Sequence, residues 1–290
     1  MSIAITAPGV YPGISDEEYH GDPVPAGSLS SSGARQILQS PAWFRYRQQH
    51  REVSRPFDVG HAVHAKVLGI GLKVEVIPTE LLDARGGLGR KDAKAWVEQV
   101  RADGHVPLKP GDWFPVERMA EAILAHPTAK ALLGQPGIPE ASVFAKDPIT
   151  EEWVRARPDF LPPRWGATTT VVDIKTTAKT ADRGRFGRTV AAYGYHQQAA
   201  WYCDAITAAR GDDEAEMVFV VVEAREPWLV GLYRLPIVAI ERGRELNRAA
   251  LDTWHQCRQT GLWPGYGDEI QTVDLPAWAL WDDDADEIEV

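Results

Sequence analysis

The chain has 290 residues, of which 44% are hydrophobic and 25% are charged, so it can bury a substantial core and is not a disordered chain. No apolar run approaches the roughly 18–20 residues of a membrane span, and the N-terminus lacks the pattern of a secretory signal, so we expect a cytoplasmic protein without membrane contact. Two cysteines, Cys203 and Cys257, are too few for a disulfide framework, a four-thiolate zinc site or an iron–sulfur cluster.

The formal net charge of −10 argues against a partner as acidic as DNA, but the charge is unevenly distributed. The last nine residues, DDDADEIEV, carry six acids, and the rest of the chain has a net charge of only −4. The basic residues form two clusters. The first contains Arg35, Arg45, Arg47, Arg51 and Arg55, and the second contains Lys175, Lys179, Arg183, Arg185 and Arg188.

The first half of the chain is predicted to be mostly helical. The serines of 28–32 can cap a helix that runs through Leu38, and Pro41 suits the first position of a second helix. A third helix over about 57–68 places His61 and His64 on one face, because they are three residues apart. Further helices are expected at about 91–102 and 114–133.

From residue 140 the hydrophobic period becomes that of strands, which we expect at about 140–146, 152–159, 169–176, 216–223 and 228–235. Helices are expected near 189–209 and 237–259. The fold class is therefore α/β, a mixed central sheet flanked by helices with helical N-terminal additions. We expect one domain over 1–281, with a mostly helical part at 11–135, a catalytic core at 139–260 and a disordered acidic tail at 282–290.

The segment RPDFLPPRWGATTTVVDIKTT holds the residues with the strongest chemical pattern. Asp173 and Lys175 are two apart on a predicted strand and share a face, and a connection of about ten residues would bring Asp159 back beside them. Two acids and a lysine at a sheet end need compensation, and their hard oxygens suit Mg²⁺, with Mn²⁺ as a substitute. A bare D-x-K pattern is also common in surface ion pairs.

The pattern of Asp159 followed by Asp173-Ile174-Lys175 resembles the signature of the PD-(D/E)xK nucleases. Further segments in the same order are similar to the RecE-type exonucleases, the nuclease domain of exodeoxyribonuclease VIII. They are DVGHAVHAKVLG, EASVFAKDPITEEWVRARPDFLPP, VVDIKTT, YGYHQQAAWY and DLPAW. The resemblance covers roughly residues 11–280, although the segment GHAVH has His61 where that family has a small threonine.

The resemblance implies roles for individual residues. His64, Asp159 and Asp173 would bind metal, with the backbone carbonyl of Ile174 as a further ligand, while Glu140 would support the metal through water or simply be exposed. Lys175 would position or activate the attacking water, and Tyr195 and Gln198 would contact the phosphate or the lysine. The basic residues that follow the catalytic strand would contact DNA. They are Lys179, Arg183, Arg185 and Arg188.

The implied reaction is metal-assisted phosphodiester hydrolysis with two cations about 3.5–4 Å apart. The resemblance adds a 5′-to-3′ exonuclease that digests linear double-stranded DNA and leaves 3′ single-stranded tails for recombination. It also implies a ring-shaped homo-oligomer and a single-strand annealing protein of RecT type as partner. A ring could line its channel with basic residues and keep an acidic exterior.

Four alternatives remain open at this stage. Cas4-like and AddB-like nucleases share the histidine, acids and lysine, but they usually hold an iron–sulfur cluster with four cysteines. A structure-specific endonuclease could use the same centre. A DNA-binding assembly module with a vestigial nuclease fold is disfavoured by the intact motif. A dinucleotide enzyme is disfavoured because neither glycine cluster lies at a strand-to-helix turn.

Overall fold

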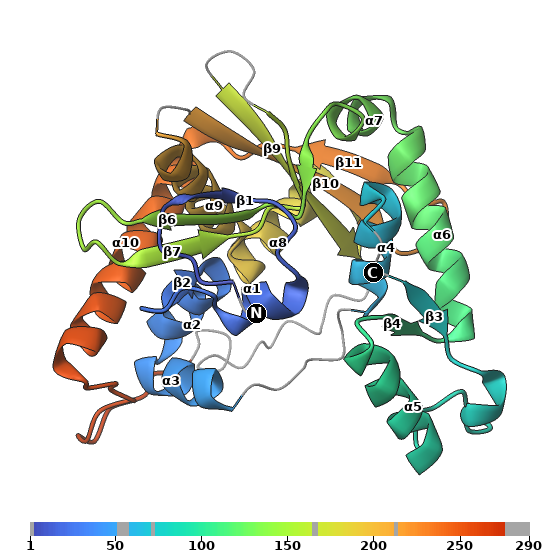
Figure 1. The fold of residues 1–290 in the computed structure, drawn as a ribbon, viewed down its shortest axis with the longest axis horizontal. Helices are drawn as coiled ribbons and strands as arrows, with labels where there is room; N and C mark the ends of the chain where they lie inside the picture. Colours follow the sequence, from blue (N-terminus) through green and yellow to red (C-terminus); the bar gives the residue numbers. More distant parts are fainter. Residues whose placement is uncertain (1–2, 51–57, 71–72, 164–167, 212–213, 276–290) are drawn as a thin grey trace, which may run out of the picture.

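A five-stranded mixed sheet runs through the middle of the protein and includes the strand predicted to carry the motif (Figure 1). The computed structural model describes residues 3–50, 58–70, 73–163, 168–211 and 214–275. Several predicted features lie outside the described residues. They are Arg51, Arg55, the start of the third helix at Phe57, and the acidic tail 282–290.

The elements before residue 135 are short strands between helices. They are β1 (Gly9–Tyr11), α1 (Asp16–Gly21), β2 (Ser28–Ser30), α2 (Ser31–Gln39), α3 (Pro41–Gln49), α4 (Asp58–Leu68), β3 (Val74–Val76), the 3-10 helix η2 (Thr79–Leu81), α5 (Lys91–Ala102), β4 (Val106–Leu108), α6 (Pro110–Ala125) and α7 (Pro127–Leu133). None of the described helices is both long and apolar enough to cross a membrane.

The elements after residue 135 form most of the sheets. They are β5 (Ile138–Pro139), β6 (Ser142–Lys146), β7 (Trp153–Ala156), β8 (Phe160–Leu161), β9 (Thr168–Thr177), α8 (Arg183–Tyr193), α9 (Tyr195–Arg210), β10 (Glu214–Glu223), β11 (Val230–Tyr233) and α10 (Ile237–Thr260). The main sheet has the order β11-β10-β9-β8-β5, with β9 and β10 parallel and the other pairs antiparallel.

Both faces of β9 and β10 are buried, because their side chains alternate between two apolar cores. Val171 and Phe219 pack in the core that contains α8, α9 and α10, whereas Val172 and Val220 pack in the core that contains α4 and α6. In Figure 1 the main sheet accordingly lies between α6 on one side and α9 and α10 on the other. The predicted class, a mixed central sheet flanked by helices, is confirmed.

The strands β6 and β7 do not belong to the main sheet, although the sequence pattern suggested one continuous set of strands. They form the middle of a separate four-stranded sheet with the order β1-β6-β7-β2, while β3 and β4 pair by themselves. The partners of β6 and β7 are strands of three residues from the N-terminal segment. Strands this short have no detectable period, so they could not be predicted from the sequence.

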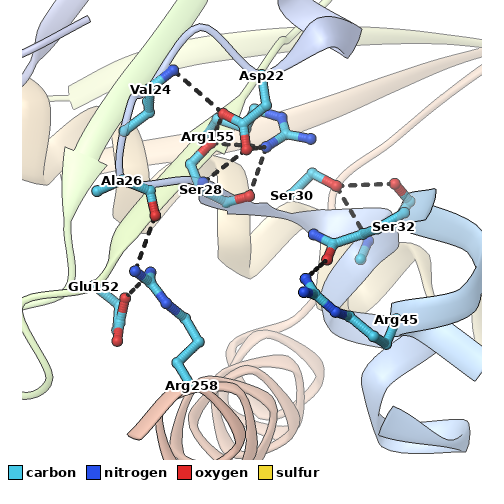
Figure 2. Close-up of polar contacts among 12 residues, drawn as sticks. Asp22, Val24, Ala26, Ser28, Ser30, Ser32, Arg45, Glu152, Arg155 and Arg258 are labelled. Atoms are coloured by element: carbon cyan, nitrogen blue, oxygen red, sulfur yellow. Dashed lines mark hydrogen bonds and ion pairs between the residues drawn. The ribbon is translucent and has the colours of Figure 1, made fainter. Parts of the chain in front are cut away.

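Polar contacts from Arg155 and Arg258 connect the N-terminal segment to β7 and to the residue before it (Figure 2). Arg155 donates to the carbonyl and hydroxyl oxygens of Ser28 at 2.6 and 2.7 Å and lies 2.8 Å from the carboxylate of Asp22. Arg258, from α10, reaches both Glu152 and the carbonyl oxygen of Ala26. Charge-assisted hydrogen bonds of this kind are among the stronger polar contacts in proteins. Here they hold β2, which leads directly into α2, in its register beside β7.

Two helices that were predicted as continuous are interrupted. The predicted helix 114–133 is two helices, because His126 adopts an extended backbone conformation before Pro127, which starts α7. The predicted helix 189–209 is also two helices, α8 and α9, which meet at Gly194 in the left-handed conformation with φ of 66°. Glycine adopts this conformation without the steric cost that a side chain would add.

Candidate active site

Asp173 and Lys175 lie on one face of β9 and form an ion pair. The Lys175 Nζ is 2.7 Å from Asp173 Oδ2, which agrees with their two-residue spacing on a strand. The sequence suggested that both residues end a strand, but this is wrong for Asp173. It is the sixth of ten residues of β9 and only 2% exposed, because β8 and β10 flank it and α9 covers it.

Asp159 and His64 approach β9 from the side of α4. Asp159 directly precedes β8, whose antiparallel pairing with β9 brings its carboxylate to the backbone of Ile174. The Ile174 N–H donates to Asp159 Oδ2 at 2.5 Å, and the Ile174 carbonyl oxygen is 3.0 Å from His64 Nε2. The other ring nitrogen, His64 Nδ1, is 3.3 Å from Asp159 Oδ1. The two predicted ligands and the predicted backbone ligand therefore meet at one point.

The helix α9 supports the opposite side of the pair. Gln198 donates from Nε2 to Asp173 Oδ1 at 3.1 Å, and the ammonium of Lys175 lies 4.6 Å from the centre of the Tyr195 ring. A lysine over an aromatic face is held by a cation–π interaction. Tyr195 is thus a partner of the lysine, and Gln198 is a partner of the carboxylate.

Glu140 lies near this cluster, but not at the start of a strand as expected. It lies between β5 and β6 with a positive φ of 46°, and its N–H donates to the carbonyl oxygen of Asp159 at 2.9 Å. Burial raises the pKa of the Glu140 carboxyl, with Arg157 opposing the rise and Asp159 adding to it. The backbone of Glu140 therefore helps to hold Asp159 in place.

Two residues that no sequence motif singles out, Arg35 and Tyr202, also lie beside this cluster. Arg35, on α2, packs against Gly194, where an added Cβ would lie 2.7 Å from Arg35 Cδ. Burial lowers the pKa of its guanidinium, while Tyr202, Tyr195 and Asp173 are close enough to raise it. Arginine stays charged throughout the working pH range. The folded chain thus adds a partly buried cation to the cluster, from a helix far away in the sequence.

The pKa values of the two aspartates are shifted in opposite directions. Burial raises the pKa of Asp173 to about 6, with Lys175 opposing the rise and Asp159 adding to it. Burial also acts to raise the pKa of Asp159, but His64 outweighs it, and the net pKa is lowered. For Lys175, burial lowers the pKa and the carboxylates of Asp173 and Asp159 outweigh it, so the ammonium stays charged at neutral pH.

A pH-dependent gain in stability should follow when Asp173 is replaced by asparagine. Because the pKa of Asp173 is higher in the folded than in the unfolded chain, its carboxylate destabilises the fold above about pH 6 and not below the unfolded value of about 3.9. The advantage of Asp173→Asn in free energy of unfolding should therefore grow between pH 4 and pH 7.5, by up to about 3 kcal/mol.

Denaturant unfolding in EDTA at the two pH values measures this difference. Asp204→Asn is the matched control, since Asp204 is 47% exposed and pairs with Arg244 at the surface, where an ion pair contributes little. A stability difference between Asp173→Asn and the unsubstituted protein that stays constant with pH would contradict the raised pKa.

Apart from Lys175, the second basic cluster is exposed and follows the motif strand directly. The chain leaves β9 at Thr177, and α8 begins after Asp182, whose side chain caps it. The cluster residues on this stretch are exposed and form no ion pair with any residue in the described ranges. They are Lys179, Arg183, Arg185 and Arg188. Arg185 and Arg188 share a face of α8, and Phe186 anchors the helix on the core.

The chemistry of the donor set fits a hard divalent cation. His64, Asp159 and the Ile174 carbonyl already converge, and the buried Asp173 Oδ2 has no well-directed hydrogen bond among the described residues. The described side chains do not include three His, Cys, Asp or Glu at the spacing of a formed metal site. The donors instead pair within the chain, His64 with Asp159 and Asp173 with Lys175.

Comparisons with known proteins agree with this architecture. The crystal structure of a "Putative exonuclease" from Eubacterium rectale superposes with a TM-score of 0.58 and 11% identity, covering 93% of this chain and 98% of that one. The structure of LHK-Exo in complex with dAMP matches with a TM-score of only 0.25 at 14% identity, over 70% of this chain and 98% of the other, which is too low to bear on the fold. A comparison with curated protein sequences found no match.

A family model matches residues 30–276, which include α2, α4 and every strand of the main sheet. The matched family is described as a PDDEXK-like domain of unknown function, DUF3799. The matched span contains His64, Asp159, Asp173 and Lys175, and the fold agrees with the PD-(D/E)xK type expected from the motif. The chain therefore belongs to the family of PDDEXK-like domains DUF3799.

Proposed function

We propose that the protein is a metal-dependent exonuclease that hydrolyses phosphodiester bonds of linear double-stranded DNA. The observation that carries the proposal is the convergence of His64 and Asp159 on the backbone of Ile174, at 2.5–3.3 Å, between the two residues of the Asp173–Lys175 ion pair. Structural ion pairs are usually exposed, whereas this one is buried and joined to a histidine and a second carboxylate.

The residues that would hold a divalent cation are His64, Asp159 and Asp173, together with the carbonyl oxygen of Ile174. A bound Mg²⁺ or Mn²⁺ supplies Lewis-acid stabilisation of the phosphate and lowers the pKa of water. Gln198 keeps the Asp173 carboxylate in a fixed orientation through its hydrogen bond to Oδ1. The Glu140 N–H braces the backbone of Asp159, and its carboxylate would support the metal through water.

Lys175 acts as a positive charge in this proposal and not as a general base. Its pKa is raised by Asp173 and Asp159, so it carries a proton at the pH of the reaction. An ammonium fixed over the Tyr195 ring can orient a water molecule and stabilise the negative charge that develops on the scissile phosphate. Arg35 adds a second cation beside Asp173 that can face the phosphate.

The finer claims concern the substrate and the assembly. We propose 5′-to-3′ digestion that leaves 3′ single-stranded tails for recombination by strand annealing, carried out by a homo-oligomeric ring with a single-strand annealing protein as partner. The similarity of the sequence segments to RecE-type exonucleases supports these claims. Digestion of linear duplex labelled at either the 5′ or the 3′ end tests the polarity. Early release of the 5′ label is expected, and early release of the 3′ label would overturn it.

Removing two charges from α8 should weaken DNA binding. The exposed part of the cluster begins six residues after Asp173, where the chain leaves β9, and we propose that it contacts phosphates near the scissile bond. Arg185→Ala/Arg188→Ala should bind duplexes of any sequence more weakly, with the slope of log affinity against log salt shallower by about one to two units, because each phosphate contact contributes roughly 0.9.

The measurement is a salt series of duplex binding in EDTA. Arg242→Ala/Arg244→Ala is the matched control, because these arginines of α10 already pair with Glu245 and Asp204. Deletion from Asp282 should leave turnover unchanged or modestly strengthen non-specific binding. An unchanged slope for the α8 variant would place the DNA path on the first basic cluster instead.

A further inference from the structure

The helix α3 exposes an aromatic and basic stripe that nothing in the catalytic centre uses. Trp43, Tyr46, Arg47 and His50 have the spacing i, i+3, i+4 and i+7, which places them along one side of the helix and its C-cap. A stripe with this spacing normally faces the core. Here Phe44 faces the core, while Trp43 and Tyr46 are each 50% exposed.

The rings of this stripe are ordered by neighbouring cations and rings. The Arg47 guanidinium lies 5.5 Å from the centre of the Trp43 ring, and the His50 ring stacks on Tyr46 at 4.2 Å. The Trp43 and Tyr46 rings are 5.4 Å apart. We call Trp43, Tyr46, Arg47 and His50 the α3 face.

The charged residues of α2 and α3 are all positive, in a protein with a net charge of −10. The two helices α2 and α3 carry three arginines and no Asp or Glu. Arg45 contacts only Gln48 and the Trp263 ring, and Arg47 only the Trp43 ring, among the described residues. Neither guanidinium therefore has its charge balanced by an acid in that part of the chain.

The place of α3 links this surface to the catalytic centre. The same α2 whose Arg35 lies beside Asp173 leads through Ser40 directly into α3, because Ser40 ends α2 and caps α3. The nine residues of α2 span only about 13 Å at 1.5 Å per residue. Figure 1 shows α3 next to α2, at the lower edge of the molecule.

We propose that the α3 face binds single-stranded nucleic acid, as a platform for the unpaired strand next to the catalytic centre. This inference extends the proposed nuclease function by adding a site for the unpaired strand. Exposed rings flanked by arginines bind single strands because unpaired bases stack on the rings while the cations contact the phosphates. A duplex keeps its bases stacked inside and cannot use the rings in this way.

Binding of labelled oligothymidine in EDTA tests the proposal without any hydrolysis. Trp43→Ala should weaken binding about tenfold or more, because base stacking on one ring contributes that much. The salt dependence of oligothymidine binding should be the same for Trp43→Ala as for the unsubstituted protein. Arg47→Ala should instead make the salt slope shallower by about 0.7, the contribution of one phosphate contact to a single strand.

The matched control is Phe114→Ala/Arg118→Ala on α6. It removes an exposed ring and an arginine four residues apart, the same spacing as in Trp43→Ala/Arg47→Ala. The control should bind like the unsubstituted protein. Trp43→Phe, which keeps a ring, should restore most of the affinity, and melting curves of all variants show whether each one folds.

An abasic oligonucleotide of equal length separates stacking from charge. Trp43→Ala should lose affinity for oligothymidine but not for the abasic strand. Equal losses on both strands, or equal losses in the α6 control, would overturn the proposal. A change in oligomeric state caused by Trp43→Ala/Arg47→Ala, without loss of oligonucleotide affinity, would also overturn it and identify an interface between copies. Binding through the α3 face without nuclease activity would overturn only the proposed function.

Discussion

Replacing Asp173 or Lys175 by alanine should lower the rate of DNA hydrolysis by at least about a hundredfold, because the first change removes a proposed metal ligand and the second removes the positive charge that faces the reacting phosphate. Both variants should fold. The Asp173 carboxylate is buried with a raised pKa, so its charged form is costly in the folded state, and Lys175 keeps 18% of its side chain exposed. Lys146→Ala, which removes an exposed lysine from β6, is the control.

The two variants should differ in metal binding. Loss of Asp173 removes a metal ligand and should weaken Mn²⁺ binding, whereas loss of Lys175 removes a repulsive charge and should leave the affinity unchanged or higher. Titration calorimetry with Mn²⁺ measures both affinities. If both variants bound Mn²⁺ like the unsubstituted protein, Asp173 would not be a ligand, and the pairing of Asp173 with Lys175 would have only a structural role.

Removal of divalent cations should abolish hydrolysis completely. Carboxylate oxygens, a carbonyl oxygen and one histidine form a donor set that suits Mg²⁺ and Mn²⁺, and the proposed reaction depends on their Lewis acidity. Activity should disappear in excess EDTA and return with Mg²⁺ or Mn²⁺. Ca²⁺ should bind without supporting turnover, since its longer and more flexible coordination does not hold the reacting groups as tightly.

Single-turnover digestion of a labelled duplex, with each cation added back to the EDTA-treated protein, measures this dependence. Thermal melting with each cation reports binding separately, because a ligand that binds only the folded state raises its stability. Full activity in excess EDTA would contradict the mechanism. Activity with Ca²⁺ equal to that with Mg²⁺ would contradict the role assigned to coordination geometry.

The core of the fold could be predicted because its strands are long and buried. The run TTVVDIKT predicted β9 to within two residues, and EMVFVVVE predicted β10 likewise, since continuous β-branched runs are typical of strands buried on both faces. The strands that were missed, such as β1 and β2, have three residues each. They exist only because β6 and β7 offer them partners, and no local pattern encodes such long-range pairing.

The interruption at Gly194 shows a different limit. Periodicity continues across it, so one helix was expected, yet the left-handed glycine separates α8 from α9 and directs Tyr195 and Gln198 toward β9. Asp182 before the Arg183-Gly184 pair was a detectable start signal for α8, because an aspartate in this position caps the free N–H groups of a helix.

The candidate site likewise contains residues that could be predicted from the sequence and residues that could not. The two-residue spacing placed Asp173 and Lys175 together, and the structure adds His64 and Asp159 at the expected point. Arg35 could not be predicted, because the sequence indicates that α2 is a helix but not which face meets α9. The burial of Asp173 was missed as well, since the exposure of a strand residue depends on its covering helix.

The central claim is that the centre around Asp173 hydrolyses linear DNA from its ends with a divalent cation. Incubation of end-labelled linear duplex beside covalently closed circular duplex, with Mg²⁺ or with EDTA, tests this claim most directly. We expect the linear duplex to be digested from its 5′ ends only with Mg²⁺, which leaves 3′ single strands, the circle to stay intact, and Asp173→Asn to leave both untouched. Cleavage of the circle, or loss of the linear duplex in EDTA or with Asp173→Asn, would contradict it.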